Sequence, residues 1–128
     1  MRPFEFTGRV RSFKHALRGI WLMLASQHNA WIHAAATLLV IGLGLYFGLS
    51  RYEWCWIVLA CASVWTAEAL NTAFELLADV STKEFHPVVS QAKDVAAGAV
   101  LLTAIGSVVI AIIIFLPHLS ACLATEAK

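Results

Sequence analysis

Residues 68–79 read Glu68-Ala69-Leu70-Asn71-Thr72-Ala73-Phe74-Glu75-Leu76-Leu77-Ala78-Asp79, and they close an apolar run that begins at Trp54. On a helix that advances about 100° per residue, positions 68, 71, 75 and 79 fall at roughly 0°, 300°, 340° and 20°, which is one narrow stripe. Ionisable groups inside a membrane-spanning helix are costly to keep there and usually serve a function. This acidic stripe, formed by Glu68, Asn71, Glu75 and Asp79, is therefore the first candidate for a functional site.

The composition favours a membrane protein. Of the 128 residues, 60% are hydrophobic and 13% are charged, which is too apolar for an ordinary soluble domain. The formal net charge is only +1, and the sequence has no basic stripe with stacking aromatics, so nucleic-acid binding is not expected. The three cysteines, Cys55, Cys61 and Cys122, lack disulfide-framework or metal-site spacing and are interpreted as small apolar residues.

Three apolar segments predict three transmembrane helices, because a helix needs about 20 apolar residues to cross about 30 Å of hydrocarbon. The predicted spans cover residues 31–49, 54–78 and 95–116. Before them, residues 11–27 place apolar side chains on one helical face and basic side chains on the other, as in a helix that lies in the headgroup region. A soluble core helix is the alternative for that segment. The predicted fold class is an all-α membrane protein, with residues 1–128 forming a single domain.

The connections and the charge distribution predict how the spans are oriented. Ser50–Glu53 and the polar segment 80–94 are the expected loops, and Pro117 is expected to end the third span. Basic residues concentrate before the first span and in the second loop: Arg2, Arg9, Arg11, Lys14, Arg18, Lys83 and Lys93, against Arg51 and Lys128 elsewhere. By the positive-inside rule, the N-terminus and the 80–94 loop face the cytoplasm, where ATP is available.

The chemistry of the acidic stripe suits phosphoryl transfer. One carboxylate can take a proton from an alcohol, and another can hold a hard cation such as Mg²⁺ through oxygen. Lys93 can neutralise phosphate charge, although Lys93 and Asp94 could instead cap the third helix. The sequence lacks the Walker A and protein-kinase motifs. Spacing alone leaves two interpretations open. One is phosphoryl transfer. The other is a structural acidic face, whose acids are satisfied by interhelical hydrogen bonds or line an ion path.

A longer sequence pattern, of which the acidic stripe is the first part, resembles that of a known protein family. It joins the acidic stripe to Glu84-Phe85-His86-Pro87 and to Gln91-Ala92-Lys93-Asp94-Val95-Ala96-Ala97-Gly98. In order and spacing it resembles the family of small prokaryotic diacylglycerol kinases and undecaprenol kinases, over nearly the whole chain. The resemblance implies a homotrimer of three-span subunits in the bacterial inner membrane, which uses ATP and Mg²⁺ and moves the γ-phosphate to a lipid hydroxyl.

The resemblance also implies residue roles. Glu68 matches the general base on the lipid alcohol, with Asn71 and Ala97 on the lipid side, and Glu75 matches a metal ligand beside the phosphates of ATP. The other matches are nucleotide-binding positions: Asp79, Glu84, Phe85, His86, Lys93 and Asp94. The individual role of Asp79 is the least defined of these.

Gln27 departs from the family pattern, because family members usually carry a glutamate there that shares the metal with position 75. An amide oxygen still reaches a cation but lacks the negative charge, so the sequence predicts weaker metal binding rather than another reaction. Asn29 and His33 match the undecaprenol-kinase-like branch, yet His28 and His33 are interpreted as satisfied polar groups near the membrane interface.

The identity of the lipid stays open between diacylglycerol and a polyprenol, although Ala96-Ala97-Gly98 is closer to the polyprenol-kinase branch. Two alternatives keep the same helices. One is a lipid phosphatase on this fold. The other is a non-enzymatic membrane protein whose acids line a cation path or an assembly interface.

Overall fold

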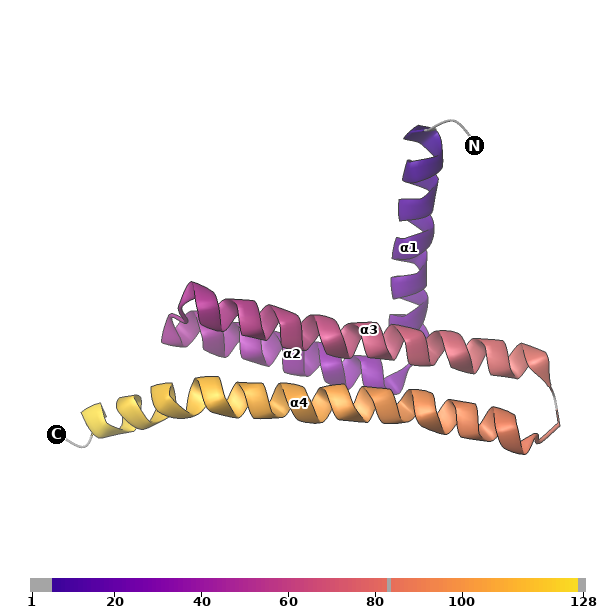
Figure 1. The fold of residues 1–128 in the computed structure, drawn as a ribbon. Helices are drawn as coiled ribbons and strands as arrows, with labels where there is room; N and C mark the ends of the chain where they lie inside the picture. The colour runs from indigo at the N-terminus through magenta and orange to yellow at the C-terminus, as the bar shows by residue number, and fades with distance from the viewer. Residues whose placement is uncertain (1–5, 83, 127–128) are drawn as a thin grey trace.

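The protein is built from helices. The computed structural model describes residues 6–82 and 84–126, and in these ranges it contains four helices. They are α1 (Phe6–Ser26), α2 (His28–Phe47), α3 (Arg51–Ser81) and α4 (Pro87–Glu126). The last three run alongside one another, while α1 projects away from them across their direction (Figure 1). Each of these three helices is long and apolar enough to span a membrane, which confirms the predicted class. Of the basic residues used to predict orientation, Arg2, Lys83 and Lys128 lie outside the described residues.

α1 is the predicted amphipathic helix, but it begins at Phe6 rather than Arg11 and ends at Ser26. Its apolar face is largely uncovered, with Phe13 67% and Trp21 72% exposed, while Met23 near its end is buried. An uncovered apolar face on a basic helix is typical of a helix that lies in the membrane interface. The orientation of α1, which projects away from the bundle across the direction of the other helices, suits that placement (Figure 1).

The predicted loop Ser50–Glu53 is wrong, because these residues start α3. Gly48 ends α2 in the left-handed conformation (φ 66°), which glycine adopts without steric cost. Ser50 is the N-cap of α3: its backbone N–H donates to Glu53 Oε2 at 2.7 Å, and its hydroxyl accepts from the Glu53 N–H at 3.4 Å. This capping box confines the connection to residues 48–50, and its Ser-x-x-Glu spacing is readable in the sequence.

The predicted loop 80–94 is also too long. α3 continues to Ser81, and Pro87 occupies the first position of α4, where a residue without an N–H is well tolerated. Within the turn, the Thr82 hydroxyl accepts a hydrogen bond from the Glu84 N–H at 3.1 Å. Lys93 and Asp94 therefore lie inside α4 and do not cap it.

Pro117 does not end the third span, because α4 continues through it to Glu126. A proline inside a helix costs about 3 kcal/mol, so the helix beyond it needs other contacts. His118 supplies them: its Nε2 lies 2.8 Å from Glu53 Oε1, and its ring stacks on Phe47 at 5.8 Å between centroids. The segment after Pro117 is thereby attached to the α2–α3 corner.

The unequal helix lengths set the level of the acidic stripe. At 1.5 Å per residue, the 20 residues of α2 span about 30 Å and the 31 residues of α3 about 46 Å. Since α3 runs back beside α2, it passes the first turns of α2 near Glu68 and then extends beyond α1, together with the start of α4 (Figure 1). Glu68 thus lies beside the first turns of α2, Glu75 meets Gln27 at the end of α1, and Asp79 lies about 6 Å further along α3.

Close packing of α2 on α3 depends on Gly44. A Cβ atom at position 44 would lie 2.8 Å from Trp54 Cη2, whereas a Cβ at Gly42 would meet nothing within 4 Å. We expect Gly44→Ala to lower the free energy of unfolding by about 1–3 kcal/mol. The matched variant Gly42→Ala should be neutral or stabilising by about 0.5–1 kcal/mol. Thermal unfolding of both in the same detergent checks this, and equal effects would contradict the described packing.

Candidate active site

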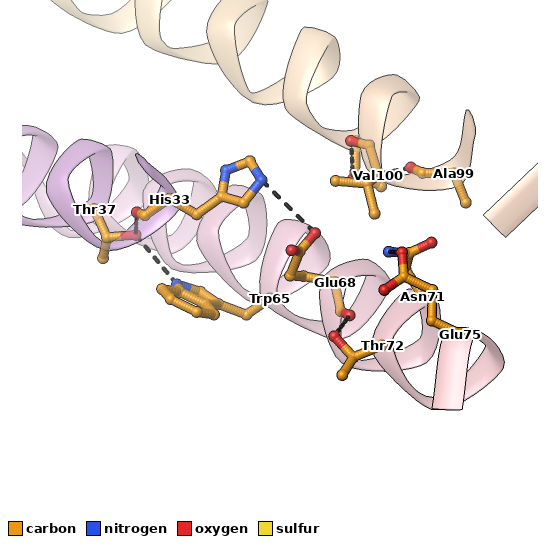
Figure 2. Close-up of polar contacts among 10 residues, drawn as sticks. His33, Thr37, Trp65, Glu68, Asn71, Thr72, Glu75, Ala99 and Val100 are labelled. Atoms are coloured by element: carbon orange, nitrogen blue, oxygen red, sulfur yellow. Dashed lines mark hydrogen bonds and ion pairs between the residues drawn. The ribbon is translucent and has the colours of Figure 1, made fainter. Parts of the chain in front are cut away.

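Glu68 is the most deeply buried ionisable residue of the candidate site. Its exposed fraction is 0%, and neither carboxylate oxygen has a hydrogen-bond partner within the described part of the chain. Nε2 of His33, on α2, lies 3.9 Å from Glu68 Oε2 (Figure 2). The helix around Glu68 is regular, and its backbone carbonyl also accepts from the Thr72 hydroxyl at 2.9 Å. Glu68 therefore presents an uncompensated carboxylate between α2 and α3.

Glu75 joins α3 to the corner between α1 and α2. Its Oε1 accepts from Asn71 Nδ2 at 3.0 Å, and its Oε2 accepts from Gln27 Nε2 at 2.7 Å. Asn71 is buried, and its Oδ1 has no hydrogen-bond partner among the described residues. The predicted neighbourhood of Gln27 and Glu75 is thus present, but Gln27 turns its amide nitrogen, not its oxygen, toward the carboxylate.

A polar cavity of about 430 Å³ lies at the turn between α3 and α4. It brings together every predicted nucleotide-binding residue except Glu75: Asp79, Glu84, Phe85, His86, Lys93 and Asp94. Lys93 Nζ lies 3.2 Å from Asp79 Oδ1, with side chains 41% and 69% exposed. Such an exposed pair contributes only about 0–1 kcal/mol, so Lys93 can readily move to another anion.

An apolar cavity of about 870 Å³ lies further along the same two helices. Asn71 and Phe74 of α3 line it, with Val88, Ala92 and Ala96 of α4 opposite. The three residues predicted to contact the lipid do not all line this cavity. Asn71 faces this cavity, whereas Ala97 is exposed on α4 and Glu68 is buried, and neither of them is among its lining residues.

The acidic stripe is thus split into two groups by its surroundings. Glu68, Asn71 and Glu75 face inward near Gln27, while Asp79 joins the polar cavity further along α3. The interpretation of His33 as an ordinary polar group missed its position beside Glu68. A signal for it existed, because His33 is an ionisable residue within the predicted span 31–49.

The metal-binding potential of this site rests on oxygen atoms. No group of three or more His, Cys, Asp or Glu side chains suitable for a metal ion occurs within residues 6–82 and 84–126. Glu75 offers a carboxylate, and the unpartnered Asn71 Oδ1 and the Gln27 amide lie next to it. Mg²⁺ usually takes one or two carboxylates and completes its shell with water and substrate phosphates, so this donor set fits the ion.

A family model for prokaryotic diacylglycerol kinase matches residues 14–115. The chain belongs to this family. The matched range contains Gln27, Glu68, Glu75 and the whole polar cavity, so the family assignment rests on the same segment as the candidate site.

Curated relatives agree with the family assignment. An undecaprenol kinase of Bacillus subtilis (strain 168) is 43% identical over 115 residues, which cover 90% of this chain and 94% of the relative. A diacylglycerol kinase of Synechocystis sp. is 35% identical over 109 residues, covering 84% of this chain and 62% of the relative. A diacylglycerol kinase of Helicobacter pylori (strain ATCC 700392 / 26695) is 29% identical over 109 residues, covering 80% and 85%. The matched family members are thus named for two different lipids.

Proposed function

We propose that this protein is a membrane lipid kinase that transfers the γ-phosphate of ATP to the hydroxyl group of a membrane lipid. The observation that carries the proposal is that two unlike cavities follow one another along α3 and α4. One is large and apolar and is lined by Asn71, and the other is polar and contains Lys93. Glu75, which accepts a hydrogen bond from Asn71, lies on α3 between the residues that line the two cavities. A lipid acceptor and a phosphate donor need such neighbouring sites.

Glu68 is proposed as the general base. The acceptor oxygen attacks the γ-phosphorus, the bond from that phosphorus to the oxygen bridging it to the β-phosphate breaks, and ADP leaves. The hydroxyl proton passes to the Glu68 carboxylate, whose oxygens are free to accept it. Because Glu68 is buried, its side chain has to turn toward the apolar cavity, which its neighbour Ala67 lines.

Glu75 and Gln27 are proposed to hold Mg²⁺ together with the phosphates of ATP. When bound, the ion supplies charge neutralisation at the phosphates. For this role the Gln27 amide turns by half a rotation, so that Oε1 instead of Nε2 faces the site beside Glu75. The same turn leaves Glu75 Oε2 free for the cation. With one carboxylate in place of two, binding of the ion relies more strongly on the nucleotide.

The residues of the polar cavity are proposed to bind ATP. Lys93 exchanges its exposed contact with Asp79 for a phosphate oxygen, which is a stronger, charge-assisted partner. Phe85 and His86 are exposed in the turn, and their rings offer flat surfaces on which the adenine ring of ATP can stack. Asp79 then serves as the resting partner of Lys93, which gives this residue a specific role.

The orientation and assembly are part of the proposal. The basic face of α1 and the position of Lys93 support a cytoplasmic location for α1 and for the α3–α4 turn in the bacterial inner membrane. Exposed apolar side chains outside the apolar cavity, such as Leu38 of α2, Val58 of α3 and Leu102 of α4, leave room for packing of copies into a homotrimer. Cross-linking in native membranes measures the number of copies, and a purely monomeric protein would contradict the trimer.

A polyprenol is the proposed acceptor, in keeping with the 43% identity to an undecaprenol kinase. We expect purified protein to phosphorylate undecaprenol faster than diacylglycerol when the two are compared side by side with γ-labelled ATP.

Gln27→Glu, which adds a second carboxylate beside Glu75, should lower the Mg²⁺ concentration needed for half-maximal rate without altering this lipid preference. A faster rate with diacylglycerol would reject the assignment of the acceptor, and an unchanged Mg²⁺ requirement would reject the role of Gln27.

A further inference from the structure

His33 is the residue whose position the proposed reaction leaves unexplained. It lies on α2, its side chain is only 16% exposed, and its Nε2 is 3.9 Å from Glu68 Oε2. Glu68 itself is fully buried and lacks hydrogen-bond partners in the described part of the chain. Figure 2 shows the imidazole directed across the α2–α3 interface toward the carboxylate.

A buried carboxylate needs a partner to stay charged. Moving an isolated ionised carboxyl group away from water is so unfavourable that the group normally takes up a proton instead. A protonated carboxylic acid cannot serve as a general base. If Glu68 accepts the proton of the lipid hydroxyl, some neighbouring group has to stabilise its carboxylate form before the reaction.

The other groups around Glu68 are poorly suited to this role. The last turns of α1, residues 20–26, and the apolar part of α4, residues 95–116, contain no charged residue. On α3 itself the next acid is Glu75, which has the same charge and is already bound by Gln27 and Asn71. Among the Lys, Arg and His side chains in the described part of the chain, only that of His33 on α2 lies within 4 Å of the carboxylate.

The backbone around His33 is fixed by contacts to α3. The Thr37 hydroxyl donates to the His33 carbonyl at 2.7 Å and accepts from Trp65 Nε1 at 3.2 Å (Figure 2). His33 also lines a small cavity of about 290 Å³ with Ala36, Thr37 and Cys61, which gives its ring room to move. Contacts of catalytic groups are often long before the substrate binds and shorten afterwards.

We propose that His33 is a positioning residue for Glu68. Its Nε2–H donates to Glu68 Oε2, which keeps the carboxylate charged and oriented and leaves Oε1 for the lipid hydroxyl. The inference rests on the proposed function, in which Glu68 is the general base. It adds a residue from α2 to a site otherwise supplied by α3, α4 and Gln27.

The test compares His33→Ala and His33→Gln with a second histidine of α2, His28, whose side chain is exposed. We expect His33→Ala to lower kcat by about 10²-fold, to leave the KM for ATP unchanged, and to move the acid limb of the kcat–pH profile to higher pH. His33→Gln retains an N–H donor and should recover most of the rate and of the profile. His28→Ala should behave as wild type.

The outcomes separate this inference from the proposed function. Two results would overturn the role of His33 while the kinase assignment stands. One is wild-type activity in His33→Ala. The other is a loss of activity in His33→Ala that leaves the pH profile unchanged and that also occurs in His33→Gln. Absence of phosphate transfer by the wild type, or full activity of Glu68→Gln, would overturn the proposed function and this inference with it. Unchanged ATP affinity in both His33 variants shows that they fold.

Discussion

Glu68→Gln is expected to lower kcat for phosphate transfer to the lipid by about 10²- to 10⁴-fold, with ATP binding unchanged. Glutamine has nearly the same shape as glutamate and still faces His33, but it cannot take the hydroxyl proton. The measurement is the rate of label transfer from γ-labelled ATP to lipid, together with equilibrium binding of a non-hydrolysable ATP analogue. Retained binding assigns the loss to the chemical step.

The matched control is Glu53→Gln, at the opposite end of the same helix. Glu53 contacts His118 and caps α3, and it lines neither the polar nor the apolar cavity, so its replacement should affect stability but not the rate per folded molecule. If Glu68→Gln lost no more activity than Glu53→Gln, the assignment of Glu68 as the base would be wrong.

Glu75→Gln is expected to lower kcat/KM for MgATP by about 10²- to 10³-fold, because it removes the carboxylate that contacts Gln27. The loss should be relieved in part by raising Mg²⁺, which separates a metal defect from a folding defect. The measurement is a Mg²⁺ titration of the transfer rate at saturating lipid.

A charge exchange provides the control for Glu75. Gln27→Glu in the Glu75→Gln background restores one carboxylate to the pair and should recover part of the lost Mg²⁺ affinity, since the two side chains touch at 2.7 Å. The same Gln27→Glu change should not rescue Glu68→Gln. Equal Mg²⁺ dependence of wild type and Glu75→Gln would contradict the proposed metal site.

Much of the fold follows from local patterns in the sequence. The amphipathic periodicity of residues 11–27 and the long apolar segments each specify one helix, and both signals depend only on neighbouring residues. The acidic stripe was likewise readable, because the helical period alone aligns Glu68, Asn71 and Glu75. These parts needed no knowledge of the rest of the chain.

The helix ends were predicted less well, because distant contacts determine them. Pro117 signals an end, yet α4 continues since His118 finds Glu53, 65 residues away in the sequence. Lys93 and Asp94 appeared to belong to a loop, but the N-terminal preference of Pro87 starts α4 ahead of them. The start of α3 is the exception, because its capping box is a local Ser50-x-x-Glu53 pattern that the sequence itself contains.

Part of the candidate site depends on tertiary structure and could not be derived from periodicity. Gln27 and Glu75 are 48 residues apart and belong to different elements, so only the family resemblance placed them together before the structure did. His33 gave no clear signal of its partner, because one histidine in an apolar segment does not reveal which helix it faces. Its distance to Glu68 is a property of how α2 packs on α3.

The stoichiometry of the reaction tests the central claim most directly. Purified protein would be incubated with ATP, Mg²⁺ and undecaprenol, while ADP and phosphorylated lipid are quantified in the same samples by mass spectrometry. The account predicts one phosphorylated lipid for each ADP formed, with both products forming about 10²- to 10⁴-fold more slowly in Glu68→Gln. ADP released without phosphorylated lipid, or no nucleotide turnover with any lipid hydroxyl offered, would contradict a lipid kinase and favour a non-enzymatic role for the acidic stripe.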